Sequence, residues 1–351
     1  MRLLKLGRRM TTMSDLAPEL VGEILARVPI TFLRAVRSTC KSWDSLSENL
    51  IFGKAVARKQ LLGFMTMDYM LCSVIFDLQG VRNGFIDISL NEIERFNRNK
   101  IDKVFHCDGL VLCVISDHAK ILVWNPYLAQ TRLITPIESF IKTTDQYALG
   151  HDSNGNQKIL KFSVCREAAY NYDTHYEIYD FSSDSWKVVW PLGPRDWSIP
   201  PCQCGLSLKG NTYFIASSIK GLACFLLCFD FTRERFGQLQ LPFHTSGYPV
   251  TLSCAWEEQL AVLYLEKEDE ILEIWVTDKI ECNTVSWSKF FKVSISIKPF
   301  NVYALGFFID EEKRVAAVFA QGKKKIERYL QNSLHHWRRS MFKICENWGI
   351  S

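Results

Sequence analysis

The sequence repeats one pattern three times, in VWNPYLAQTRLI (residues 123–134), IYDFSSDSWKVV (178–189) and CFDFTRERFGQL (228–239). Each copy is a short apolar run, a polar turn and a second run with aromatic or aliphatic residues, which is typical of a β-hairpin. A fourth copy, EIWVTDKIECNTVSWSKF (273–290), has a longer turn. The copies recur about every fifty residues, which is near the length of a kelch-type propeller blade. The pattern therefore predicts a repeated all-β domain.

Residues 59–320 keep this character throughout, with runs such as LVLCVI (110–115), KILVW (120–124) and LAVLY (260–264). These runs have the length and composition of strands. The period predicts about six blades in this region. A pair of β-sandwiches is the competing architecture, and the regular period argues against it. Trp124, Trp186 and Phe236 are large enough to fill the space between neighbouring sheets, so we expect them in the core.

Residues 13–58 differ from the rest because they predict three short helices. An apolar stripe at helical spacing runs along the first: Leu20, Val21, Ile24, Leu25 and Val28. Pro29 ends that helix, and Thr31 is suited to cap the next. So small a unit has more apolar surface than it can bury by itself. From the pattern alone, this surface packs either on a partner or on the following domain.

The identity of these helical residues resembles a known motif. The run SDLAPELVGEILARVPITFLRAVRSTCKSWDSL (14–46) resembles the F-box, including its ending Arg37-x-x-Cys40-Lys41-x-Trp43. Ala17 stands where the family has proline, and Pro18 follows it directly. The resemblance implies that the module binds Skp1, the adaptor of cullin-based ubiquitin ligases. The Skp1 contacts carried over are Leu16, Pro18, Leu20, Ile24, Leu25, Val28, Pro29 and Leu33. Val36, Cys40 and Trp43 are expected to hold the helices together.

The β region resembles the plant F-box-associated type 1 domain, which is related to kelch-like propellers. The resemblance rests on long motifs, among them CDGLVLC (107–113), YEIYDFSSDSW (176–186) and FFIDEEKRVAAVF (307–319). The expected fold is therefore α + β multidomain, a three-helix F-box followed by a propeller-like domain.

Together the two resemblances imply a substrate-recognition adaptor of a ubiquitin ligase. The F-box would hold Skp1 and, through it, a cullin, while the β domain binds a protein target that the sequence does not identify. The alternative is a non-catalytic interaction protein that binds Skp1 or a target without productive ubiquitination.

The two ends of the chain depart from this pattern. Residues 1–12 are expected to be an N-terminal extension. After Phe319 the resemblance stops, and residues 321–351 form a divergent basic tail, which we interpret as the product of a shifted reading frame. The last blade is therefore expected to be incomplete and to leave an open strand edge.

The composition excludes several classes of function. A net charge of only +4 does not indicate nucleic-acid binding. No apolar run is long enough for a signal peptide or a membrane span. The chain is therefore expected in the cytoplasm or nucleus, with its twelve cysteines reduced.

The sequence also lacks the motifs of common catalytic and metal sites. It has no CxxC pair, no HExxH run and no phosphate-binding glycine loop. We predict no catalytic residue, metal or cofactor. A Cys–His nucleophile stays open, since such partners meet only in space.

Overall fold

The computed structural model describes residues 61–322 and 342–346, apart from gaps at 83–84, 97, 116–119, 127, 129, 138–144, 164–175, 191–195, 201–203, 220–222, 246–249, 256–258, 267–270, 295–299 and 311–314. The N-terminal extension and the predicted F-box helices lie outside the described residues. The prediction that can be compared with the structure is therefore the β domain.

The described residues form six antiparallel sheets, each built from consecutive strands. The first sheet contains β1 (Leu61–Met67), β2 (Met70–Arg82) and β3 (Phe85–Glu92). The short 3-10 helix η3 (Glu94–Phe96) leads to the second, with β4 (Ile101–Cys107), β5 (Leu110–Ile115), β6 (Lys120–Asn125) and β7 (Gln130–Ile134). The third contains β8 (Asp145–His151), β9 (Gln157–Ser163), β10 (Tyr176–Asp180) and β11 (Ser185–Val189).

The other three sheets follow in chain order. The fourth contains β12 (Trp197–Ser198), β13 (Leu206–Leu208), β14 (Asn211–Ser218), β15 (Cys224–Asp230) and β16 (Arg235–Leu239). The fifth contains β17 (Val250–Ala255), β18 (Gln259–Glu266), β19 (Ile271–Glu281) and β20 (Thr284–Ser294). The sixth contains β21 (Phe300–Asp310), β22 (Val315–Gly322) and β23 (Phe342–Glu346).

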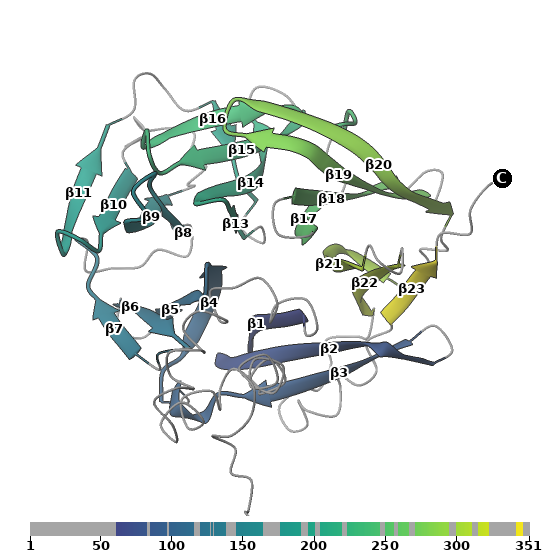
Figure 1. Cartoon of the computed structure of the whole chain (residues 1–351), viewed down its shortest axis with the longest axis horizontal. Coiled ribbons are helices and arrows are strands. Elements are labelled where there is room, and N and C mark those ends of the chain that lie inside the picture. Colours follow the sequence, from purple (N-terminus) through teal and green to yellow (C-terminus); the bar gives the residue numbers. More distant parts are fainter. Residues whose placement is uncertain are drawn as a thin grey trace, which may run out of the picture.

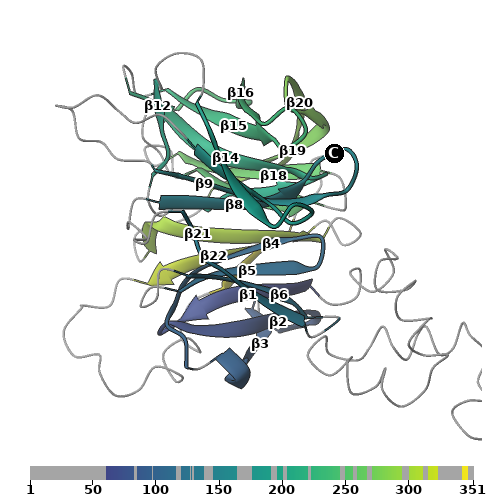
Figure 2. The ribbon, with the colours of Figure 1, turned by 90° about the vertical axis from the view of Figure 1, so that its left-hand side faces the viewer.

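The sheets stand around a common axis. Figure 1 shows β4, β8, β13, β17 and β21 nearest the middle of the ring and β7, β11, β16 and β20 at its rim. Figure 2 shows the same ring from its side. The structure confirms the prediction of an all-β domain, and its six sheets match the number expected from the repeat. Six separate sheets around one axis do not fit the competing pair of sandwiches.

The core lies between neighbouring sheets, in clusters that repeat around the ring. Trp124 is 2% exposed and packs edge-on to Phe96, with the ring centroids 5.1 Å apart, between the first and second sheets. Trp186 packs against the cluster between the second and third sheets. Phe236 packs against the cluster between the third and fourth. All three therefore fill the space between sheets, as their size predicts.

The first and last sheets lie next to each other, because β23 contacts β3. Each has three strands among the described residues. The outer strand of the last sheet, β23, comes from residues 342–346, within the segment that we expected to be a divergent tail. The domain end at residue 320, the incomplete last blade and the shifted reading frame stay predictions.

Candidate functional site

None of the residues predicted to contact Skp1 lies within the described part of the chain. The same holds for Val36, Cys40 and Trp43. The positions and roles of all of these residues stay predictions. The described residues instead give the two faces of the ring, on which strand ends and their connecting segments gather.

The two faces differ in which strand ends they hold. One face, here called the turn face, holds the connections after β4, β6, β8, β10, β13, β15, β17 and β19. The other, the loop face, holds the ends of β5, β7, β9, β11, β14, β16 and β18. The β1–β2 turn belongs to the loop face, because the Tyr69 carbonyl oxygen accepts a hydrogen bond of 2.9 Å from the N–H of Ile101, where β4 begins.

The turn face is made of tight polar turns. Only Asp108 and Gly109 separate β4 from β5, and both have positive φ, 45° and 82°. Only Lys209 and Gly210 separate β13 from β14, again with positive φ, 51° and 76°. Such turns need residues that tolerate the left-handed region. They leave little backbone free to adapt to a partner.

A cluster of charges joins the third and fourth sheets at the turn face. The Lys158 ammonium, on β9, lies 3.5 Å from Asp152, 3.9 Å from Asp180 and 3.0 Å from Glu234. Glu234 belongs to the β15–β16 turn of the next sheet, and it also pairs with Lys187 at 2.6 Å. The Lys158 side chain is only 8% exposed, so solvent screens these pairs less than it screens surface pairs.

Hydrogen bonds within this cluster favour the charged forms of its acids. Burial opposes the charge of Glu234, but hydrogen bonds from Lys187 and Lys158 outweigh it and lower the pKa of Glu234. A hydrogen bond from Ser182 lowers the pKa of Asp180. Every charge in the cluster has a partner from its own sheet or from the neighbouring sheet. We therefore assign it a structural role.

The loop face carries almost all the large apolar side chains that are exposed. Seven such side chains are found among the described residues: Tyr69, Leu128, Leu133, Ile137, Val188, Trp190 and Ile219. All except Leu128, which follows β6 on the turn face, lie at or next to strand ends on the loop face. Trp190 is the most exposed, at 63%. These side chains lie in or next to the first four sheets, so they are distributed around the ring.

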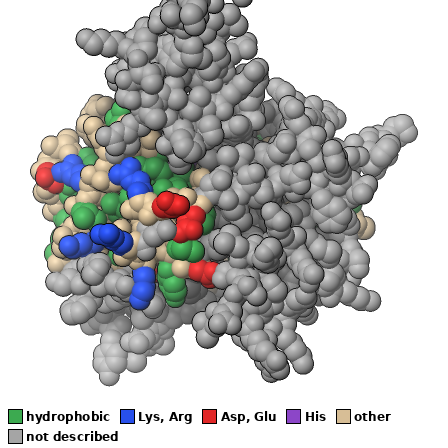
Figure 3. All heavy atoms as spheres, turned by 90° about the horizontal axis from the view of Figure 1, so that it is seen from below, with side chains coloured by type: hydrophobic (Ala, Val, Ile, Leu, Met, Phe, Trp, Pro, Cys, Tyr) green, Lys and Arg blue, Asp and Glu red, His purple; other side chains and the backbone are tan. Residues whose placement is uncertain are grey.

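The described connections on the turn face are short, with two residues after β4 and β13 and four after β10 and β15. The long intervals 164–175 and 323–341 lie outside the described residues. Figure 3 shows the rim of the ring from below, where apolar, basic and acidic side chains are mixed over the described part.

A cysteine, an aspartate and a histidine do meet at the turn face. The Cys107 Sγ lies 3.4 Å from Asp108 Oδ2, and that oxygen lies 3.2 Å from His151 Nε2. Burial, followed by the charge of Asp108, raises the pKa of the Cys107 thiol well above its usual range. A nucleophilic thiol needs the opposite shift. This arrangement therefore gives no support to a Cys–His nucleophile.

Two further thiols within the described residues also have a raised pKa. Burial raises the pKa of Cys113 to about 12 and that of Cys254 to about 11. No group of three or more His, Cys, Asp or Glu side chains suited to a metal ion occurs in the part of the chain that the structure describes.

One expectation about the thiols was wrong. Cys228 and Cys282 form a disulfide, although all cysteines were expected to be reduced. The spacing of the cysteines did not indicate this bond, because 54 residues separate the two partners.

No helix among the described residues has the length and hydropathy needed to span a membrane.

The comparison with known families accounts for both parts of the chain. The family described as "F-box associated beta propeller domain" matches residues 62–344, and the F-box domain matches residues 13–54. The chain belongs to the F-box-associated β-propeller family. The six sheets around one axis are thus the F-box-associated propeller, and each sheet is a blade. The family match ends beyond the expected domain end at residue 320.

Proteins of Arabidopsis thaliana are similar to this chain over most of their length. An F-box/kelch-repeat protein of Arabidopsis thaliana is 49% identical over 88% of this chain and 82% of its own. An F-box protein of the same plant is 47% identical over 91% of this chain and 89% of its own. Among solved structures, a dipeptidyl peptidase 4 of Porphyromonas gingivalis covers 71% of this chain and 41% of its own, with a TM-score of 0.37 and 9% identity. That likeness is too low to carry an argument.

Proposed function

We propose that this F-box-associated propeller protein is the substrate-recognition adaptor of a Skp1–cullin–F-box ubiquitin ligase in the cytoplasm or nucleus. The observation that carries the proposal is the combination of an F-box match at residues 13–54 with a propeller match at 62–344. The F-box binds Skp1 and, through it, a cullin. The propeller binds a protein target, and other subunits transfer the ubiquitin.

The mechanism is tethering. Holding the target beside the charged ubiquitin carrier replaces an encounter in solution with one at a high effective concentration. The adaptor needs no nucleophile or metal for this role. The raised pKa values of the buried thiols fit a chain that contributes binding surfaces.

The loop face is our candidate for the target surface. It gathers the exposed apolar side chains, and Trp190 is a residue type that often dominates binding energy. The chain enters β1 at Leu61, which pairs with Phe76 at the end of the strand away from the loop face. The chain therefore enters β1 at the turn-face end, and the F-box match precedes this point in the sequence.

The test of the adaptor role is co-purification of the full chain with Skp1 and a cullin. Leu20→Asp and Val28→Asp each place a charge on the apolar stripe predicted to contact Skp1. We expect each to reduce recovery of Skp1 by at least about tenfold, since burying an unpaired carboxylate costs several kcal/mol.

The matched control is Leu128→Asp, which places the same charge at an exposed turn of the propeller. It should leave Skp1 recovery unchanged. Normal Skp1 binding by both F-box variants would show that the contact residues are wrong. Absence of Skp1 from the unaltered protein would rule out the adaptor role itself.

A further inference from the structure

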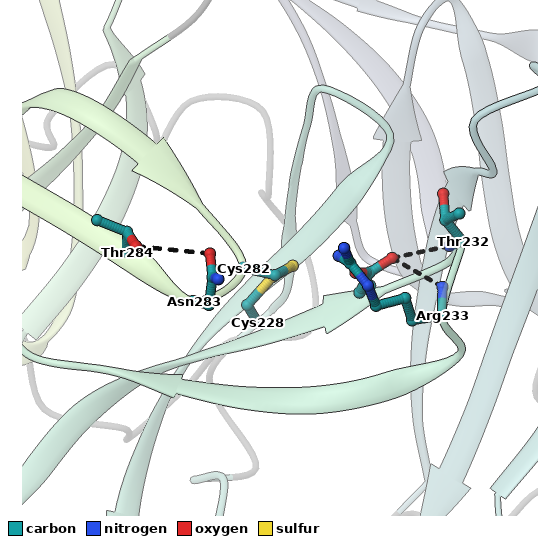
Figure 4. Close-up of a disulfide and its surroundings, with 7 residues drawn as sticks. Cys228, Thr232, Arg233, Cys282, Asn283 and Thr284 are labelled. Atoms are coloured by element: carbon teal, nitrogen blue, oxygen red, sulfur yellow. Dashed lines mark hydrogen bonds and ion pairs between the residues drawn. A yellow bond between two sulfur atoms is a disulfide. The ribbon is translucent and has the colours of Figure 1, made fainter.

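The disulfide joins two different blades. Cys228 lies in β15 of the fourth sheet and is wholly buried, whereas Cys282 lies in the turn between β19 and β20 of the fifth and is partly buried. Figure 4 shows the hairpin turn reaching across to β15, with the two sulfur atoms bonded between the sheets. The Cα atoms are 5.5 Å apart, within the ordinary range for a disulfide.

The packing around the bond brings the two cysteines together independently of it. Gly237 pairs with Cys228 across β15 and β16, and a Cβ atom at Gly237 would collide with the carbonyl oxygen of Cys282. The glycine therefore makes room for the hairpin turn. Farther along the same hairpin, the Trp287 indole N–H donates a hydrogen bond of 3.0 Å to the Gln240 carbonyl oxygen of the fourth sheet. The two sulfurs therefore stay adjacent when the bond is reduced.

We propose that Cys228 and Cys282 form a redox-sensitive latch between the fourth and fifth blades. This rests on the proposed function in one respect, the intracellular location. In the cytosol and nucleus thiols are kept reduced, and a disulfide that forms there is usually transient and responsive to oxidants. A latch at this interface would adjust the rigidity of the receptor domain to the redox state of the cell.

The chemistry needs a disulfide oxidant such as oxidised glutathione. The Cys282 thiolate attacks one sulfur of the oxidant, forms a mixed disulfide and releases one reduced glutathione. The Cys228 thiolate then attacks Cys282 Sγ and releases the second glutathione. The two cysteines lose two protons and two electrons in total, and the oxidant accepts them. Cys282 is the entry point because Cys228 is buried.

The other described thiols differ in exposure. Cys204 and Cys254 are exposed, so they can form mixed disulfides with glutathione, and peptide mapping distinguishes these adducts from the Cys228–Cys282 bond. Burial raises the pKa of Cys72, Cys107 and Cys113, which lowers the fraction of each present as the reactive thiolate. Cys224 lies four residues before Cys228 on the same strand and forms no disulfide in the structure. It provides a matched control for a cysteine substitution in this blade.

The experiment equilibrates the purified full chain in glutathione buffers of increasing oxidised fraction and then alkylates it with a maleimide under denaturing conditions. Along this series we expect peptide mapping to find a disulfide-linked pair of peptides that contain Cys228 and Cys282, and this link should be reversible. The oxidised chain should melt several degrees higher than the reduced chain, since the bond closes a long loop in the unfolded state.

Cys282→Ser should abolish both the linked peptide pair and the melting shift, whereas Cys224→Ser should keep both. Two results would overturn the latch. One is a bond that forms in no buffer. The other is a bond that stays fully oxidised in excess reduced glutathione, which would make it a permanent link. Skp1 recovery is measured on the same samples, so that failure of the latch and failure of the adaptor role are told apart.

Discussion

Single residues at the turn face hold neighbouring blades together through charge. The Glu234 carboxylate forms ion pairs with two lysines of the third blade. Its oxygens lie 3.0 Å from the Lys158 ammonium on β9 and 2.6 Å from the Lys187 ammonium on β11. The Glu234 backbone carbonyl also accepts the Tyr176 hydroxyl at 2.5 Å. Removing its charge would leave the nearly buried Lys158 with only the more distant carboxylates of Asp152 and Asp180. The stability of this contact should therefore depend on one carboxylate.

We predict that Glu234→Gln lowers the free energy of unfolding by about 1–3 kcal/mol at neutral pH. The folded state lowers the pKa of Glu234 below its usual 4.5. A lowered acid pKa gives stability that is present above the unfolded value and lost as pH falls through the folded value. The difference from the unaltered protein should thus be constant at neutral pH and shrink below about pH 4.5.

Urea denaturation at several pH values measures this difference. The control is Glu94→Gln, which removes one carboxylate from an exposed position in η3. It should change the free energy of unfolding by less than about 0.5 kcal/mol at every pH. A difference for Glu234→Gln that does not vary between pH 7 and pH 3 would contradict the charge-based explanation.

Some residue roles could be predicted from the sequence, and others could not. Trp124, Trp186 and Phe236 were placed correctly because a large aromatic ring inside a strand has few places to go other than the core. The Lys158 cluster was missed because Asp152, Asp180 and Glu234 look like ordinary solvated turn residues. The contacts of these carboxylates with Lys158 depend on how two blades pack against each other, and a local sequence pattern does not specify that packing. The same is true of Cys228 and Cys282.

At the scale of strands, one contact between blades occurs twice. The Trp186 indole on β11 donates a hydrogen bond of 2.9 Å to the carbonyl of Thr135, the residue after β7. The Trp287 indole on β20 donates one to the carbonyl of Gln240, the residue after β16. In each case the outer strand of a blade bonds to the end of the outer strand of the preceding blade. The sequence repeat is thus accompanied by the same indole-to-carbonyl hydrogen bond at two interfaces between blades.

We predict that Trp287→Phe, which keeps the aromatic ring and removes the N–H, lowers the free energy of unfolding by about 1 kcal/mol. Thermal denaturation should detect this as a fall of about 2–4 °C in Tm. Gln240→Ala is the control, because Gln240 is exposed and accepts the bond through its backbone carbonyl, which this substitution keeps. Equal falls for both variants would mean that the indole bond adds nothing to the contact between blades.

Strand positions were more predictable than strand directions. The run at 110–115 is β5, and the run at 120–124 lies within β6 (Lys120–Asn125), because strands buried on both faces appear as continuous apolar runs. The direction of β1 could not be read in this way. It follows from the hydrogen bond between Tyr69 and Ile101, which joins two blades. Without the hydrogen bond between Ile101 and Tyr69, the exposed Tyr69 side chain could not be assigned to the loop face.

At the scale of the whole molecule, the two faces of the ring differ in their turns, ion pairs and exposed side chains. The turn face combines short turns with ion pairs that are satisfied within the domain, and the chain from the F-box enters β1 at that end. The loop face has most of the exposed large apolar side chains among the described residues. A target bound at the loop face would leave the F-box end available to the ligase. This division of roles can be tested with paired substitutions.

We predict that Trp190→Ser and Ile219→Ser, which remove apolar groups from the loop face, reduce target capture by at least about tenfold when combined, since a central aromatic contact is worth about 2 kcal/mol or more. Both side chains are more than half exposed, so Tm and Skp1 recovery should stay unchanged. Proximity labelling in a Leu20→Asp background, where captured targets are not consumed, measures capture. Leu128→Ser is the matched control, because it removes an exposed apolar group from the turn face. If Leu128→Ser depletes the same labelled proteins as the loop-face pair, the target surface is not confined to the loop face.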